Sequence, residues 1–330
     1  MTITVEAMQS PNRIARDRAA VVRRFALTDS VFRTLTHLSA ALVLVILGGV
    51  AISLVIGAWP ALSHFGAAFF VTESWNPVTE KFGALAPIYG TLVTSLIAIV
   101  IAVPIGIGIA MFLTELCPRS LRRPIGIAVE LLAGIPSIIY GIWGLFVFAP
   151  FLQVHLQPFI INLFHGIPGL SSLFAGPPYG IGLMTSGLIL AIMVLPFITS
   201  ITKDVFDTVP AVLKESAYGI GCTTWEVTRR VVIPYTRVGI MGGVMLGLGR
   251  ALGETMAVTF VIGNAHRISA SLFAPGTTIS ASIANEFTEA DGALYTSSLI
   301  ALGLILFIIT FLILAASRLM LMRIERRAGS

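Results

Sequence analysis

The stretch IYGTLVTSLIAIVIAVPIGIGIAMFL, residues 88–113, decides the fold, because it contains no Asp, Glu, Lys or Arg. About 20 helical residues are enough to cross a hydrocarbon core of ~30 Å. Over the 330 residues, hydrophobic side chains make up 56% and charged side chains 11%. A soluble protein of this composition could not bury its apolar surface. The sequence therefore predicts a membrane protein.

Six segments are long and apolar enough to span the bilayer, which predicts an all-α membrane protein with six transmembrane helices. An even number of spans places both termini on one side. Residues 154–180 are also fairly apolar, but prolines interrupt or bound them, and we interpret them as an external loop, with a partly re-entrant segment as the alternative. The six segments are 38–59, 88–113, 125–150, 181–201, 239–262 and 295–317.

The basic residues indicate the orientation. All 21 Lys and Arg residues except Lys81, Arg250 and Arg267 fall in the two termini and in the loops 114–124 and 202–238. The positive-inside rule places these segments in the cytoplasm. We divide the chain into a cytoplasmic N-terminal tail (1–33), a transmembrane domain (34–320) that includes the loop 202–238, and a cytoplasmic C-terminal tail (321–330).

The loop 202–238 has the pattern of a helix, a turn and a second helix. Pro210 suits the first turn of the first helix, which ends at Gly219 and Gly221. TTWE, residues 223–226, fits the capping box that opens a second helix, and this helix is expected to run to Pro234. From the pattern alone, a surface helical hairpin without a special role is an equal alternative.

The same loop resembles the EAA loop of ABC importer permeases, because Glu215, Ala217, Gly221 and Pro234 stand at the spacing of that motif. Serine replaces the middle alanine, and Val231 and Ile233 replace Ile and Leu. The resemblance implies the type I ABC importer permease architecture. It also implies that these four residues belong to a coupling helix that docks on an ATPase subunit.

Two further blocks, 133–146 and 247–258, resemble the PstC family of phosphate-importer permease subunits, and the similarity covers most of residues 91–317. The sister PstA family has a different version of the second block. The resemblance implies phosphate import through a pathway shared with a PstA-like second permease. It further implies a PstB-like ATPase dimer and a PstS-like phosphate-binding protein as partners, in addition to membrane lipids.

The chain has no G-x-x-x-x-G-K-[ST] phosphate-binding loop, so we expect no enzymatic activity and no cofactor in this chain. ATP and magnesium are expected in the partner ATPase. The two cysteines and five scattered histidines suggest no metal site. The net charge of +5 reflects topology, so we expect no nucleic-acid partner.

The block GLGRALGETMAV, residues 247–258, places Arg250 and Glu254 at the middle of the predicted fifth span. Charges at the centre of a membrane helix cost about 2.5–3.5 kcal/mol each, so they should face protein or a water-filled pathway. Small residues at 239, 243, 247, 251 and 255 form a stripe beside them that lets another helix approach closely. A structural ion pair between the two charges is the alternative interpretation.

A guanidinium matches a phosphate with a fixed fork of donors, and a carboxylate can accept the proton that hydrogen phosphate carries. Pro136 interrupts the third span beside Ser137, where free backbone N–H groups could meet an anion, although a packing kink is the preferred explanation of this proline. The predicted substrate-pathway residues are therefore Arg250, Glu254, Thr255 and Ser137.

Two other functions fit part of the sequence. The first is a permease for another oxyanion. The second is an ion-driven carrier or channel, which could also hold an Arg and a Glu at mid-membrane but has no need of the spacing between Glu215 and Pro234. A membrane enzyme is less compatible, because no nucleophile with a neighbouring base and no metal cluster can be recognised.

Overall fold

The computed structural model describes the backbone of residues 10–328 and the side chains of residues 28–323. Over these residues the regular elements are helices, with one isolated bridge between Asn76 and Lys81. The chain forms two units, Met1–Ile56 and Gly57–Ser330. The helices, with π-helical turns named η, are α1 (Ser10–Phe65), α2 (Ala68–Val71), α3 (Leu85–Met111), η1 (Phe112–Leu116), α4 (Arg119–Ala133), α5 (Ser137–Trp143), η2 (Gly144–Phe148), α6 (Ala149–Phe151), η3 (Leu152–Leu156), α7 (Gln157–Phe164), α8 (Leu170–Leu173), α9 (Leu183–Asp207), α10 (Ala211–Gly219), α11 (Thr224–Val227), η4 (Thr228–Val232), α12 (Ile233–Leu252), α13 (Met256–Thr259), α14 (Ile279–Glu286) and α15 (Ala293–Ala328).

Among the residues that the structure describes, six helical segments are long and apolar enough to cross a membrane, as the sequence predicts. The bounds of four agree with the expected spans to within a few turns, and the third and fifth differ. The six segments are Thr28–Phe65, Leu85–Leu116, Ser137–Phe164, Leu183–Asp207, Thr224–Leu252 and Ala293–Arg323.

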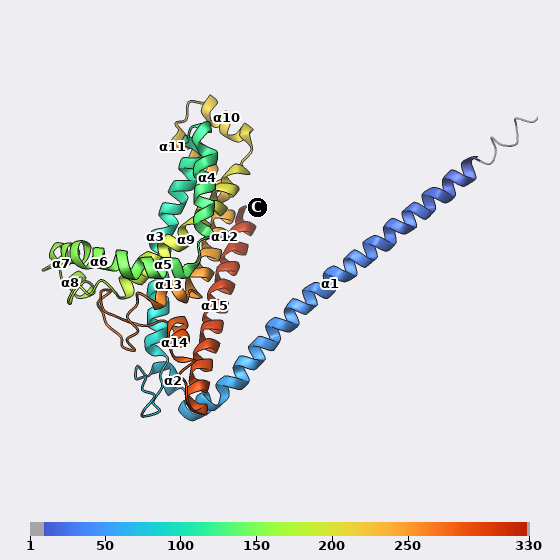
Figure 1. Ribbon diagram of the computed structural model, residues 1–330. Helices are drawn as coiled ribbons and strands as arrows, with labels where there is room; N and C mark the ends of the chain where they lie inside the picture. Colours follow the sequence, from blue (N-terminus) through green and yellow to red (C-terminus); the bar gives the residue numbers. More distant parts are fainter. Residues whose placement is uncertain (1–9, 329–330) are drawn as a thin grey trace, which may run out of the picture. The chain divides into compact units, whose positions relative to one another are not determined.

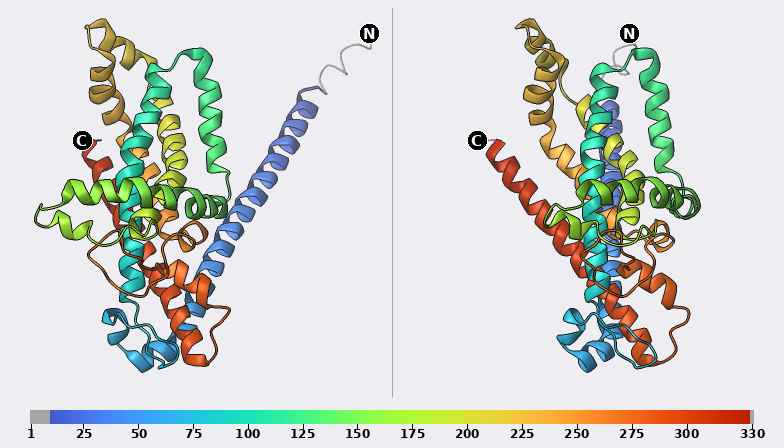
Figure 2. Two further views of the ribbon diagram at one scale, coloured as in Figure 1. Left: turned by 60° about the vertical axis from the view of Figure 1, so that its left-hand side comes forward. Right: turned by 90° about the vertical axis from the view of Figure 1, so that its left-hand side faces the viewer.

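The third segment corrects our prediction of a span over 125–150. Pro136 has no N–H and pushes Ile135 out of the helical conformation, so α4 ends at Ala133 and α5 begins at Ser137. Helix α4 then runs along α9, whereas the helices from α5 to α7 lie across the bundle (Figure 1, Figure 2).

The prediction of an external loop over 154–180 is wrong for its first part, because residues up to Phe164 are helical. Pro158, which we expected to interrupt or bound this stretch, occupies the first turn of α7, and Pro150, the expected end of the third span, occupies the first turn of α6. Each follows a π-helical turn, η2 or η3, and a first-turn position does not need the missing N–H.

The fifth segment differs at both ends. Pro234 lies in the first turn of α12 directly after η4, so the helix that opens at the capping box continues past it to Leu252. Residues 253–255 then leave the helix, and α13 is a separate short helix. The predicted unbroken helix over 239–262 is therefore wrong.

Helix α9 is the centre of the second unit. In its most apolar stretch of 18 residues 61% is buried, compared with 28% in the most apolar stretch of the segment that contains α3. The predicted stripe of small residues is confirmed from Gly239 to Ala251, which form the surface of α12 that meets α9, but not for Thr255, which lies beyond the end of α12. A Cβ at Gly239 would lie 2.5 Å from Val205, and one at Gly247 would lie 2.9 Å from Val194. Glycine at these positions lets the two backbones approach closely.

Helix α3 packs on the other side of α9 and also meets a late part of the chain. Thr91 Oγ1 donates to the carbonyl of Pro87 (2.8 Å) and accepts the N–H of Ile279, the first residue of α14 (3.0 Å). The two ends of this bundle have different elements: α10 and α11 lie at one end, and α2 and α14 at the other (Figure 1, Figure 2).

Candidate functional site

The first candidate site is the junction between α12 and α13. Arg250 lies in the last turn of α12, and its Cζ is 4.3 Å from the centre of the Phe197 ring on α9. Its Nε is buried and has no hydrogen-bond partner in the described part of the chain. Buried polar groups are almost always hydrogen-bonded, so this donor without an internal partner is an exception that requires an explanation.

Glu254 lies beyond the end of α12 and does not pair with Arg250. Its Oε1 accepts the N–H of Ala257 in α13 (3.3 Å), and the ion pairs found among residues 28–323 do not include these two side chains. The prediction that both charges lie at the middle of one continuous span is wrong, because the helix ends at Leu252. The structural ion pair receives no support from this geometry.

Helix α5 packs against α13 and brings the two sequence blocks together. A Cβ on Gly141 would lie 2.8 Å from Phe260 and 3.0 Å from the carbonyl of Met256. Ser137 starts α5 one turn before Gly141, and Thr255 directly precedes α13. These two helices lie between the α10 end and the α14 end of the bundle (Figure 1). Arg250, Glu254, Thr255 and Ser137 therefore come from one region near the middle.

Sequence analysis missed two aromatic residues at this junction. Phe197 contributes its ring face to Arg250, and Tyr140 of α5 lies within electrostatic reach of the same guanidinium. The Tyr140 hydroxyl donates to the carbonyl of Leu132 (2.9 Å), across the break at Pro136. Both residues stand in apolar runs, where an aromatic side chain has no distinguishing pattern.

The second candidate site is the loop that contains α10, and its predicted helix–turn–helix is confirmed. After α10, the N–H of Cys222 bonds to the carbonyl of Ala217 (3.1 Å) and that of Gly221 to Tyr218 (2.9 Å), with φ of Gly221 at +89°. This is the Schellman arrangement, in which a left-handed glycine ends a helix. The capping box between Thr223 and Glu226 opens α11 as predicted.

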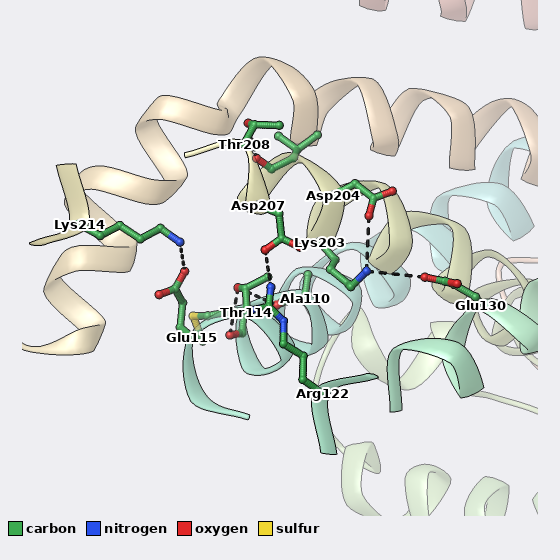
Figure 3. Close-up of polar contacts among 12 residues, drawn as sticks. Ala110, Thr114, Glu115, Arg122, Glu130, Lys203, Asp204, Asp207, Thr208 and Lys214 are labelled. Carbon is green, nitrogen blue, oxygen red and sulfur yellow. Dashed lines mark hydrogen bonds and ion pairs between the residues drawn. The ribbon is translucent and has the colours of Figure 1, made fainter. Parts of the chain in front are cut away.

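Two contacts fix α10 to the membrane bundle. Ala217 is buried in an apolar cluster with Phe206 of α9 and Ile240 of α12. Lys214 Nζ lies 2.6 Å from Glu115 Oε1 at the end of α3, where the glutamate is almost fully buried (Figure 3). Glu215 and Pro234 are exposed. The loop is thus rigidly joined to three long helices and presents Glu215 outward.

A third polar cluster lies at the α14 end. Glu286 accepts hydrogen bonds from Trp75 Nε1 (2.6 Å) and the Tyr295 hydroxyl (2.6 Å), and its other oxygen is 2.7 Å from His266 Nε2. Burial raises the pKa of Glu286, but the hydrogen bonds from His266, Tyr295 and Trp75 outweigh it, so the pKa lies below its ordinary value. This carboxylate connects two loops to α14 and α15.

Comparison with known proteins agrees with this architecture. The family model for the binding-protein-dependent transport system inner membrane component matches residues 102–328. A chain from a structure of the MetNI methionine ABC transporter in an inward-facing conformation has the same fold, with a TM-score of 0.55 and 17% identity, over 72% of this chain and 94% of that chain. The protein is thus a multi-pass membrane component of an ABC transporter. It belongs to the family of binding-protein-dependent transport system inner membrane components.

Two relatives are much more similar in sequence. The phosphate transport system permease protein PstC of Mesorhizobium japonicum is 80% identical, over 96% of this chain and 97% of its own length. The protein of the same name from Pasteurella multocida is 58% identical, over 91% of this chain and 94% of its own.

Proposed function

We propose that this chain is a permease subunit of an ATP-driven phosphate importer and forms the phosphate pathway together with a second, PstA-like permease. The observation that carries the proposal is the buried, unpartnered Nε of Arg250 at the break between α12 and α13. The names of the relatives, 80% and 58% identical, agree with phosphate as the substrate.

In this proposal Arg250 binds the phosphate oxygens with its guanidinium, and the charge offsets a dianion in a site of low dielectric. Glu254 accepts the proton of hydrogen phosphate, which sulfate at neutral pH does not have. The hydroxyls of Ser137 and Thr255 complete the set of polar groups from α5 and α13. Because Arg250 and Glu254 are not paired, each is free to meet the substrate.

The α10 loop supplies the connection to ATP hydrolysis. We infer that exposed Glu215 contacts a PstB-like ATPase dimer, which holds ATP and magnesium, while Ala217, Gly221 and Pro234 set the position of α10. A rigid loop fixed to α3, α9 and α12 can transmit a movement of the partner to the bundle. In this orientation the α10 end and both termini face the cytoplasm of a bacterial cell, and the α14 end faces a PstS-like binding protein.

The test is phosphate uptake by proteoliposomes that contain the complete complex. We expect uptake to require both the ATPase subunit and ATP, and a tenfold excess of sulfate to leave it unchanged. Uptake driven by an ion gradient without the ATPase would identify a secondary carrier instead. Strong inhibition by sulfate would indicate a permease for another oxyanion.

A further inference from the structure

A charged pocket lies at the α10 end of the bundle, away from the junction of α12 and α13. It is formed between α4, from Arg119 to Glu130, and the last turns of α9, and its volume is about 370 Å³. A pocket of this size is within the range that holds small ligands. The lining residues are Arg119, Arg122, Arg123, Gly126, Ile127, Glu130, Lys203 and Asp207.

The carboxylates of this pocket are already engaged. Asp207 pairs with Arg122, while Glu130 lies 3.6 Å from Lys203 Nζ, which is also 3.5 Å from Asp204 just outside the pocket (Figure 3). Arg119 and Arg123 have no ion-pair or hydrogen-bond partner among the residues whose side chains the structure describes. The pocket thus keeps two free guanidinium groups.

The position of these arginines on α4 adds to the positive potential. Arg119, Arg122 and Arg123 stand in the first two turns, where residues three and four apart are neighbours on the helix surface. The first turn of α4 has no acidic residue, and the amino end of a helix is itself positive. The orientation of the protein in the membrane requires basic residues in this region, but not their convergence with Lys203 of another helix on one pocket.

We propose that this pocket binds a phosphate group, either inorganic phosphate or the phosphodiester of an anionic lipid. Arg119 and Arg123 donate charge-assisted hydrogen bonds to the phosphate oxygens, while Lys203, which contacts Glu130 and Asp204, balances the carboxylate side of the pocket. Ile127 gives the pocket an apolar side that a lipid glycerol could contact. The site shares no residue with the transport pathway and does not depend on the proposed function.

The experiment compares the full-length protein with two double variants that each remove two positive charges. The double variant Arg119→Gln with Arg123→Gln removes the two guanidinium groups that have no partner among the described side chains. Arg229→Gln with Arg230→Gln, on η4, is the matched control, because it removes an arginine pair elsewhere in the predicted cytoplasmic loops. Correct insertion is verified by the yield of monodisperse protein, so that a loss of binding is not a loss of folding.

Two measurements distinguish the two sources of phosphate. Equilibrium binding of radiolabelled inorganic phosphate is measured in nanodiscs of phosphatidylcholine. Native mass spectrometry of protein extracted in mild detergent then counts the phosphatidylglycerol and cardiolipin molecules that remain bound. We expect either inorganic phosphate or one of the two lipids to bind to the pocket variant roughly tenfold or more weakly than to the wild type, because charged hydrogen bonds are lost. The same ligand should bind to the control variant as it binds to the wild type. If the pocket variant behaves like the wild type in both measurements, or if the control variant loses the same ligand, the proposal is wrong.

Discussion

At the scale of single residues, the charge of Arg250 within the membrane has a free-energy cost that other interactions have to offset. A charged side chain within the membrane costs about 2.5–3.5 kcal/mol, whereas a cation–π contact such as the one with Phe197 returns about 0.5–2 kcal/mol. The contact therefore offsets only part of the cost. The remainder needs an anion or a water-filled pathway, and both agree with a role in transport.

Arg250→Gln is predicted to abolish almost all phosphate uptake while the yield of the assembled complex stays the same. Glutamine keeps hydrogen-bond donors but loses the charge that offsets a dianion. Arg250→Lys should restore a part of the uptake, because lysine keeps the charge and loses the fork. Uptake and yield are measured together in proteoliposomes.

The double variant Arg250→Gln with Glu254→Gln provides the control for this prediction. Since Glu254 bonds to the N–H of Ala257 and not to Arg250, removing both charges should not restore uptake. A double variant that transports normally would show that the two charges are scaffold.

Phe197→Leu is predicted to slow uptake by about two- to thirtyfold, because a cation–π contact contributes about 0.5–2 kcal/mol to holding the guanidinium in place. The yield of the complex should stay near that of the wild type. Phe146→Leu is the matched control, since the side chain of Phe146 is exposed. Equal rates for the two variants would mean that the ring does not position Arg250.

At the scale of elements, α10 ends through local chemistry that acts on the backbone. A Cβ on Gly221 would meet nothing within 4 Å, so space does not require glycine there. The backbone conformation requires glycine, because φ is +89° and a residue with a side chain costs about 1–2 kcal/mol in this left-handed region. The direction in which the chain leaves α10 thus depends on this single residue.

Gly221→Val is therefore predicted to uncouple ATP hydrolysis from uptake in the complete complex, while the chain still inserts into the membrane. ATPase activity and phosphate uptake are measured on the same preparation. Gly219→Ala is the control, because Gly219 also has open space around it but an ordinary helical φ. Normal uptake by the Gly221→Val complex would show that this turn is not the joint.

The sequence predicts those elements whose signals are local. The turn at Gly221, the capping box at Thr223 and the face of α12 that meets α9 could all be predicted, because each depends on neighbouring residues or on helical spacing. The path of residues 137–164 could not be predicted. Its prolines are accommodated by π-helical turns, and these form where a helix packs around its neighbours.

The candidate pathway also has features that the sequence predicts and features that it does not. Arg250 and Glu254 could be singled out because charges in an apolar run are conspicuous. Their separation at the end of α12 could not be predicted, since it depends on α13 packing against α5 through Gly141. Phe197 is one aromatic residue in an apolar span, and only the folded chain brings it to Arg250.

At the scale of the whole molecule, Glu286 connects distant parts of the chain and makes the α14 end sensitive to acid. Its folded-state pKa is lowered, so its stabilising contribution is present at pH values above its ordinary value of 4.5 and is lost as the pH falls through the lowered pKa. At neutral pH Glu286 is therefore ionised, and its contribution to the stability of the α14 end is fully present.

Glu286→Gln is predicted to lower the thermal stability at pH 7 and to flatten its decline below pH 4.5. Each hydrogen bond to the charged carboxylate contributes about 1.5–3 kcal/mol, and glutamine replaces these with weaker neutral bonds. Thermal unfolding is followed in detergent between pH 3 and pH 7. Glu289→Gln is the control, and its thermal stability should decline with falling pH as that of the wild type does. If the Glu289 variant instead shows the same decline as the Glu286 variant, Glu286 is excluded as the titrating group.

The bond between Thr91 and Ile279 has a consequence for the order in which the protein is made. The two residues are 188 positions apart. At a synthesis rate of about 5–20 residues per second, Thr91 leaves the ribosome some ~10–40 s before its partner exists. During that interval the hydroxyl can donate to Pro87 within its own helix, so α3 can wait in the bilayer without an unpaired donor. We therefore expect insertion of α3 and its final packing to be separate events, so that a nascent chain that stops before Ile279 contains an inserted α3 in which Thr91, in the second turn, still lacks its partner.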